Sequence, residues 1–213
     1  MTAQDHNPRN IIATAIILVV ALAAGMLTAW LLFMQKPDLS GLKATVFNQP
    51  RSIQPFELVD HHGKAFTVDS LKGHWSFVFF GYTHCPDVCP TTLSVLNSVA
   101  AKLAEQDTQA RFVFLSVDPE RDTPEVLEQF VSYFNGDFIG VTGEPAAIDA
   151  LTRQLGVMHM RVGDDNDSSG SYLVDHTASV LLFDPAGRYH GLFSPPLIAA
   201  EISDEFIAIA GAY

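Results

Sequence analysis

The sequence predicts an α/β domain, a mixed sheet flanked by helices, behind one N-terminal transmembrane helix. Three observations support this fold class. Residues 11–34 carry no charged side chain. A helix needs about 20 residues to cross a bilayer, so this run is long enough. The rest of the chain alternates short apolar runs, typical of buried strands, with amphipathic segments at helical spacing. Its two cysteines, Cys85 and Cys89, lie where one predicted strand gives way to a helix.

The composition narrows the classes of function. The 213-residue chain has 12 Lys and Arg against 24 Asp and Glu, for a formal net charge of −12. Proteins hold phosphate backbones with Lys and Arg, so we expect no nucleic-acid partner. Two cysteines are too few for a disulfide-stapled scaffold, and a close pair in one short motif indicates metal or redox chemistry.

The N-terminus is predicted to be a membrane anchor. Residues 1–10 form a short tail, and residues 11–34 form the span. The apolar core of a cleaved signal peptide is usually about 7–15 residues long, so an uncleaved anchor fits this longer run better. The tail contains Asp5 and a single arginine, unlike a mitochondrial presequence. Lys and Arg occur on both sides of the span and do not decide its orientation. A single-pass bacterial inner-membrane protein is favoured over a mitochondrial one.

Beyond the span, residues 35–50 contain Pro, Gly and Ser and are predicted to form a linker. The globular domain is predicted to cover residues 51–213 and to open with a β-hairpin. His61-His62-Gly63 lies at the turn of that hairpin. We interpret His61 and His62 as exposed turn residues rather than metal ligands.

The elements predicted within the domain alternate between strands and helices. Leu93 and Leu96 recur at helical spacing after the cysteines, and Thr123 followed by Pro124 is typical of a helix N-cap and first turn. The polar stretch 164–170 lacks the spacing of a calcium-binding EF-hand loop and is predicted to be a hairpin tip. Strands are expected at 56–60, 64–67, 75–80, 111–118, 138–141, 179–183 and 188–193, a helical turn at 70–72, and helices at 91–105, 124–134, 144–155 and 198–210.

This order of elements predicts a sheet with helices on both faces, and a cysteine pair at the first strand-to-helix turn is typical of a thioredoxin-like fold. Thioredoxins space the two cysteines as Cys-x-x-Cys, whereas Cys85 and Cys89 are separated by three residues. If the turn is helical, positions four apart project to one side, so both sulfurs could face one ion.

The chemistry of the cysteine pair is open from the residues alone. Thiolates bind soft metals and attack disulfides, and a helix N-terminus favours the thiolate. Two thiolates and one imidazole would suit monovalent copper and, with a further ligand, the divalent ion. His176 and His84 are both candidates for that imidazole. A closed structural zinc site needs four ligands, more than this set offers.

Three separate motifs resemble the Sco/SenC family of copper-binding assembly proteins. They are Tyr82-Thr83-His84-Cys85-Pro86-Asp87-Val88-Cys89-Pro90, Ser116-Val117-Asp118-Pro119-Glu120-Arg121-Asp122-Thr123 and Val174-Asp175-His176-Thr177. The resemblance covers residues 51 to 210 and includes the single anchor. It implies a membrane-tethered thioredoxin-like fold that faces the periplasm or the intermembrane space. It also implies binding of Cu(I) and Cu(II) by Cys85, Cys89 and His176. We interpret Asp118 as a group at the end of a strand rather than a ligand.

We therefore expect a copper metallochaperone for cytochrome c oxidase. The resemblance implies the CuA-bearing subunit as its partner, with other copper chaperones as further partners, and a soluble domain in the periplasm. One alternative is a thiol-disulfide oxidoreductase, in which Cys85 and Cys89 form a redox-active disulfide and keep the cysteines of the target reduced. Another is a redox or copper sensor, although the tail at residues 1–10 leaves little room for a cytoplasmic output.

Overall fold

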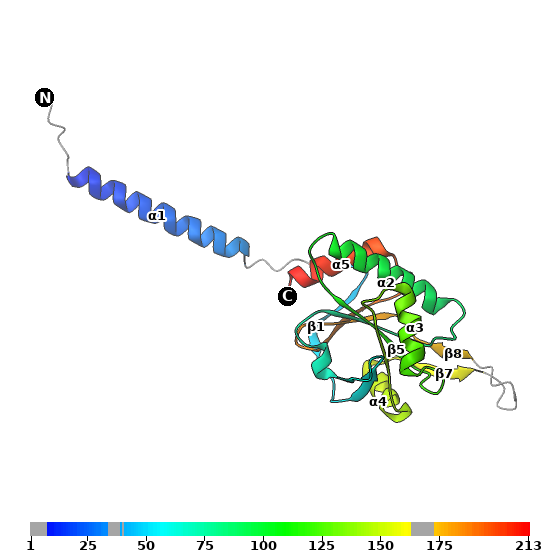
Figure 1. Ribbon diagram of the computed structural model, residues 1–213. Helices are drawn as coiled ribbons and strands as arrows, with labels where there is room; N and C mark the ends of the chain where they lie inside the picture. The colour runs from blue at the N-terminus through cyan, green and yellow to red at the C-terminus, as the bar shows by residue number, and fades with distance from the viewer. Residues whose placement is uncertain (1–7, 34–38, 40, 163–172) are drawn as a thin grey trace, which may run out of the picture. The chain divides into compact units, whose positions relative to one another are not determined.

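The structure is a computed structural model that describes residues 8–33, 39, 41–162 and 173–213. It divides into an N-terminal unit that runs through Asp38 and a folded domain that begins at Leu39. Figure 1 shows the long N-terminal helix and the α/β domain. The predicted hairpin tip at residues 164–170 lies outside the described part of the chain.

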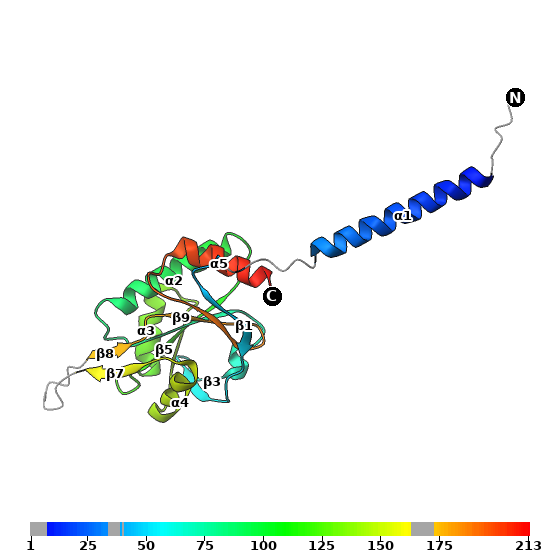
Figure 2. The same ribbon diagram turned by 180° about the vertical axis from the view of Figure 1, so that it is seen from behind.

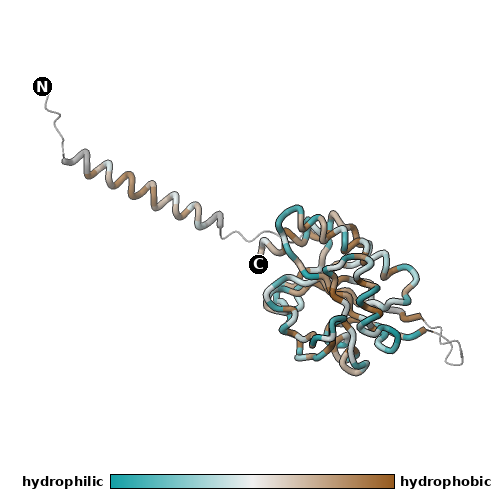
Figure 3. Tube along the Cα trace, in the orientation of Figure 1, coloured by the Kyte–Doolittle hydropathy of each residue, from teal (hydrophilic) through white to brown (hydrophobic). Residues whose placement is uncertain are grey.

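The N-terminal unit is one helix, α1 (Pro8–Phe33). Its segment Ile12–Trp30 has a mean hydropathy of 2.5 and side chains that are exposed along its whole length, which Figure 3 shows as a largely apolar helix. By length and composition this segment could cross a bilayer. The predicted tail at residues 1–10 is corrected at its end, because residues 8–10 belong to α1. Residues 1–7 of that tail and residues 35–38 of the predicted linker lie outside the described residues.

The domain is built on an eight-stranded mixed sheet with the order β1-β10-β9-β4-β5-β6-β2-β3. The central strands β4, β5 and β6 are parallel to one another, and the remaining pairs are antiparallel. A separate antiparallel ribbon joins β7 to β8, and Figure 2 shows it projecting from one end of the domain. The strands are β1 (Thr45–Arg51), β2 (Glu57–Asp60), β3 (Ala65–Thr67), β4 (Ser76–Gly81), β5 (Arg111–Ser116), β6 (Ile139–Thr142), β7 (His159–Val162), β8 (Leu173–His176), β9 (Val180–Phe183) and β10 (Tyr189–Phe193).

Four longer helices cover the sheet, and they are α2 (Val88–Ala104), α3 (Pro124–Phe134), α4 (Pro145–Leu155) and α5 (Ala199–Gly211). A short 3-10 helix, η1 (Val68–Leu71), follows β3. The predicted cap of α3 is confirmed, because Thr123 Oγ1 accepts a hydrogen bond from the Val126 amide and Pro124 lies in the first turn. Figure 1 shows α2 and α5 on one side of the sheet and α4 on the other, as a sheet with two apolar faces requires.

Side-chain alternation along β4 and β5 builds both halves of the core. On one face, the Phe77 ring lies 5.0 Å from that of Phe206 in α5, and the Phe114 ring lies 5.3 Å from that of Phe130 in α3. On the other face, Val78 and Phe80 of β4 meet Leu151 and Leu155 of α4, among others. Each fully buried phenylalanine contributes about 1.5–3 kcal/mol of hydrophobic free energy. The two helix layers are therefore held to the same pair of strands.

The predicted linker at 35–50 is corrected at its C-terminal end. Residues 45–50 belong to β1, which pairs antiparallel with β10 at the edge of the sheet. The carboxylate of Glu205 in α5 holds the segment before β1 by accepting the amides of Lys43 (2.8 Å) and Ala44 (2.9 Å). The edge strand is half exposed, polar and contains Pro50, so it lacks the alternating apolar pattern that marks strands in a sequence. The strands β7 and β8, on either side of the predicted hairpin tip, were missed as well.

The two histidines at the first hairpin differ from the prediction in one respect. His62 is exposed at the turn, but His61 is 8% exposed and belongs to the buried set. The Nδ1 atom of His61 accepts the Gly140 amide (2.8 Å), and the His61 amide donates to the Gly140 carbonyl (2.8 Å). His61 therefore joins β2 to β6. A hairpin turn that docks on a neighbouring strand buries a side chain that local sequence places in solvent.

The last residue of β4, Gly81, lies where the structure has no space for a side chain beside the cysteine motif. A Cβ atom added at Gly81 would lie 2.7 Å from Cε2 of Phe114 and 2.8 Å from Sγ of Cys89. Both distances are shorter than contacts between such atoms allow. The absence of a side chain at Gly81 therefore lets the Cys89 sulfur lie against the strand.

We predict that Gly81→Ala lowers the free energy of unfolding of the domain by about 1–3 kcal/mol, because the added methyl group overpacks the core. Urea denaturation of the two proteins measures the difference. Gly136→Ala is the matched control, since an added Cβ at Gly136 meets no described atom within 4 Å. Equal losses in the two variants would show that Gly81 is not under steric constraint.

Candidate metal centre

A strand, a turn and a helix position the two cysteines. β4 ends at Gly81, and α2 begins at Val88, three residues before the predicted start. This earlier start places Cys89 in the first turn of α2. Cys85 lies in the preceding turn, where its amide donates to the Tyr82 carbonyl (3.2 Å). Cys89 is fully buried and Cys85 is partly exposed, so the pair has one inner and one outer sulfur.

The structure brings the two sulfurs together. The Cys89 amide donates to Cys85 Sγ at 3.4 Å, and both cysteines are free thiols. The first turn of α2 therefore directs a backbone N–H at the outer sulfur, where the positive end of the helix dipole also lies. Spacing four along a helical turn places the thiols side by side, in reach of one ion or of each other.

Burial of Cys89 makes its ionisation depend on a partner. The pKa of the Cys89 thiol is raised far above its ordinary value, mainly because burial disfavours the thiolate. The neighbouring thiol of Cys85 and the carboxylate of Asp122 raise that pKa further. A metal ion would supply the positive charge that this thiolate lacks, and binding would release the thiol proton. The inner cysteine is therefore poorly suited to act unaided as a nucleophile.

The third candidate ligand, His176, is placed by its backbone alone. It ends β8 and lies opposite His159 of β7, and its side chain lies outside the described part of the chain. Among the side chains that are described, no three His, Cys, Asp or Glu groups gather as a metal site. The two cysteines thus come together in the described structure, and the imidazole of His176 stays a prediction.

Two contacts hold the β7–β8 ribbon at the cysteine end of the domain. The Val174 amide hydrogen-bonds the buried Tyr82 hydroxyl, and Arg161 forms an ion pair with Glu120 at 2.8 Å. A cavity of about 540 Å³ lies between the cysteine turn and the ribbon. Its lining residues are Tyr82, Cys85, Pro86, Asp87, Val88, Val162, Leu173, Val174 and Ala178. Tyr82 thus links the strand that carries His176 to the motif that carries the thiols.

A buried carboxylate lies behind the cysteine turn. Asp122 is fully buried and accepts hydrogen bonds from Ser116 Oγ (2.6 Å), Thr83 Oγ1 (2.6 Å) and the Thr83 amide (3.0 Å). Burial raises the pKa of Asp122, and these hydrogen bonds oppose that rise. Asp118, at the end of β5, instead pairs with Arg121. The carboxylate that holds the turn is therefore Asp122, and Asp118 acts at the end of the strand, as interpreted from the sequence.

Sequence reasoning missed Tyr82, Thr83 and Asp122 as residues that shape the site. The first two were inside the cysteine motif, and Asp122 was inside the second motif. The local signal was the unusual run of Ser, Asp and Thr around two strand ends, because buried polar side chains need partners. Their pairing across 39 residues of sequence is visible only in the folded chain.

Known proteins share this arrangement of elements. The chain is 36% identical over 196 residues to the SCO2-like protein RP587 of Rickettsia prowazekii, covering 91% of this chain and 95% of that protein. A copper-bound structure of Arabidopsis thaliana ScoI is 32% identical, with a TM-score of 0.71 over 75% of this chain and 98% of that one. Copper-bound ScoI of Bradyrhizobium japonicum is 38% identical, with a TM-score of 0.65 over 72% of this chain and 96% of that one.

These likenesses confirm the thioredoxin-like fold class predicted from the order of elements and the cysteine pair. The family model for SCO1/SenC matches residues 45–210, from the edge strand β1 to the closing helix α5. That range begins before the predicted domain boundary at residue 51, in agreement with the position of β1. The chain belongs to the SCO1/SenC family.

Proposed function

We propose that the protein is a membrane-anchored copper metallochaperone that binds one copper ion through Cys85, Cys89 and His176. The observation that carries this proposal is the hydrogen bond from the Cys89 amide, in the first turn of α2, to the Cys85 sulfur. Copper-bound relatives of the same fold support the choice of metal. The ion is cargo that is bound and then passed on.

The ligand chemistry of the pair favours copper. Thiolate sulfur is a soft ligand that selects Cu(I), and an added imidazole suits Cu(II) as well. The buried Cys89 would supply a thiolate that is stabilised only when the ion is present, which couples deprotonation to binding. The partly exposed Cys85 would keep one side of the ion accessible. A recipient protein could then approach the ion at Cys85 and replace one ligand at a time.

The proposed recipient is the CuA-bearing subunit of cytochrome c oxidase, and other copper chaperones are proposed as donors. Membership of the SCO1/SenC family supports this proposal. The cavity between the cysteine turn and the β7–β8 ribbon supports a protein recipient, because exposed Val88, Val162 and Leu173 border Cys85 there. Apolar side chains around an exchangeable ligand would contact a partner while copper moves.

A second candidate function is thiol-disulfide exchange towards the cysteines of the same target. One observation favours it, namely that the outer sulfur is accessible and accepts the amide of the inner cysteine. The outer thiolate would attack the target disulfide, and the inner thiol would then displace the reduced target as the Cys85–Cys89 disulfide forms. Copper binding needs a third ligand, whereas this reaction needs only the two thiols. Substitution of His176 therefore separates the two functions.

We propose that α1 tethers the domain to a bacterial inner membrane, with the domain in the periplasm. The apolar segment Ile12–Trp30 supports the anchor, and the domain begins after a short connection at Leu39. The site would then stay close to the membrane, where the oxidase is assembled.

The first prediction from the proposed function concerns the copper ligands. We expect one copper per reduced chain, with tight binding abolished by Cys85→Ser or Cys89→Ser because one thiolate and one imidazole hold copper poorly. His176→Ala should weaken binding, more for the divalent ion than for the monovalent ion. Metal analysis and the thiolate-to-copper absorption bands measure the effect, with His62→Ala at the exposed turn as the control histidine. Copper bands that survive all three ligand substitutions would place the site elsewhere.

The second prediction concerns oxidation. Removal of two electrons and two protons from Cys85 and Cys89 should form a disulfide and abolish copper binding, because a disulfide sulfur carries no thiolate charge. The oxidised protein should regain the metal only after reduction, and bound copper should protect both thiols. Alkylation of the reduced apo, oxidised and copper-loaded forms, with labels counted by mass, tests this. Full copper binding by the oxidised form contradicts the shared site.

The third prediction concerns the anchor. Residues 11–34 should remain in the mature protein, since their length suits a membrane span better than a signal-peptide core. Mass spectrometry of the membrane-extracted protein gives the N-terminus directly. A soluble mature protein that begins near Gln35 would show that the segment is a cleaved signal.

A further inference from the structure

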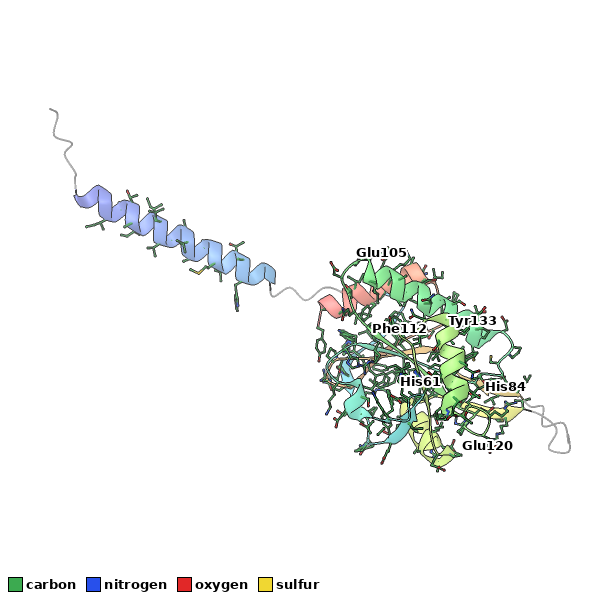
Figure 4. All side chains as sticks on the ribbon, in the orientation of Figure 1. His61, His84, Glu105, Phe112, Glu120 and Tyr133 are labelled. Carbon is green, nitrogen blue, oxygen red and sulfur yellow. The ribbon has the colours of Figure 1, made fainter. Side chains whose placement is uncertain are left out.

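His84 is an exposed imidazole next to the outer thiol, and a chain of hydrogen bonds reaches it from the buried interior. Its Nδ1 atom lies 3.1 Å from Thr83 Oγ1. Thr83 Oγ1 in turn donates to Asp122 Oδ1 at 2.6 Å. Figure 4 labels His84 and Glu120 at the same end of the domain, and Glu120 is the residue that holds the ribbon through Arg161.

The protons along this chain can be assigned. Asp122 accepts from Ser116 Oγ, from the Thr83 amide and from Thr83 Oγ1. The oxygen of Ser116 also accepts the Asp118 amide at 3.0 Å, and its one hydroxyl proton is donated to Asp122. The single proton of the Thr83 hydroxyl therefore points at Asp122.

This assignment sets the tautomer of His84. With its proton committed to Asp122, the Thr83 oxygen can only accept from the imidazole, so Nδ1 of His84 carries the hydrogen. In the neutral ring, Nε2 then presents its lone pair, and the side chain is exposed. Imidazoles that bind metals commonly donate their other N–H to such a partner, which fixes the orientation of the ring. His84 has this arrangement, because its Nδ1–H donates to the Thr83 hydroxyl, which in turn donates to the Asp122 carboxylate.

The geometry points to His84 Nε2 as a docking ligand that receives Cu(I) from a carrier and hands it to Cys85. This inference rests on the proposed copper function and adds a point of entry to it. His84 is adjacent to Cys85 in the chain, and both are accessible, whereas Cys89 is buried. Copper that arrived at the surface would therefore meet the imidazole and the outer thiol before the inner one.

The step is a ligand exchange without a change in oxidation state. A Cu–Nε2 bond forms at His84 as one ligand of the carrier leaves. A Cu–Sγ bond to Cys85 then forms as the remaining ligands of the carrier leave, and the Cys85 thiol proton passes to solvent water. The Cu–Nε2 bond breaks as Cys89 coordinates, and the Cys89 thiol proton also passes to water. Monovalent copper accepts both imidazole nitrogen and thiolate sulfur, so each intermediate keeps ligands of a suitable kind. The buried sulfur of Cys89 gives the final bound state.

The test measures loading kinetics with Cu(I) bicinchoninate as the carrier. Transfer to the reduced protein is followed by loss of the carrier colour in a stopped-flow instrument. His84→Ala should load about tenfold more slowly than wild type, in line with the loss that removal of a metal-site partner causes, and should reach the same final stoichiometry. His62→Ala, an exposed histidine at the first hairpin, should load at the wild-type rate.

The relay has its own test. Thr83→Val removes the hydroxyl and should slow loading, whereas Thr83→Ser keeps it and should load as wild type does. Ring ¹⁵N shifts of the reduced apoprotein report the tautomer directly, and the Nδ1–H form is expected at His84. The opposite tautomer, or equal loading rates in wild type and His84→Ala, overturns the docking role while the copper function stands. Lower final stoichiometry at an unchanged rate makes His84 a permanent ligand and also overturns it. A wild-type chain that takes up no copper overturns the proposed function itself.

Discussion

The site depends on the close approach of the Cys89 sulfur to the end of a buried strand. Gly81 leaves the space for that sulfur, and Phe114 of the neighbouring strand closes it from the side. With Cys89 held there, the first turn of α2 directs its amide at Cys85 and brings the outer thiol to the inner one. A strand that ended one residue earlier or carried a side chain at this point would separate the sulfurs. The packing of the core at Gly81 therefore also determines the positions of the two cysteines.

Polar contacts complete what apolar packing begins. The buried carboxylate of Asp122 joins the end of β5 to the cysteine turn through Ser116 and Thr83. A buried carboxylate with unmet acceptors would be costly, so these donors stabilise it and hold the turn in one conformation. Tyr82 extends the same turn towards the ribbon through the Val174 amide. The residues around the thiols therefore connect both sides of the predicted copper site.

The two functions proposed for the pair of sulfurs compete for the same electrons. Copper requires both thiols reduced, while oxidation joins them and removes their charge. The asymmetry between a buried Cys89 and an accessible Cys85 suits both reactions, because exchange with a partner begins at the outer sulfur in each case. Substitution of His176 or His84 would distinguish the two proposed functions, since neither imidazole is needed to exchange a disulfide.

The sequence by itself determined the apolar N-terminal helix, the order of most strands and helices, and the two cysteines at a strand-to-helix turn. These follow from length, periodicity and caps, which act between residues close in the chain. Only the tertiary structure decided that residues 45–50 form an edge strand, that His61 is buried and that Asp122 holds the cysteine turn. Each of these depends on a partner far away in sequence, Tyr189 and Leu192 for β1, Gly140 for His61 and Thr83 for Asp122. Burial and hydrogen bonding between distant residues leave no local pattern in the sequence, because the two residues become neighbours only when the sheet and helices pack together.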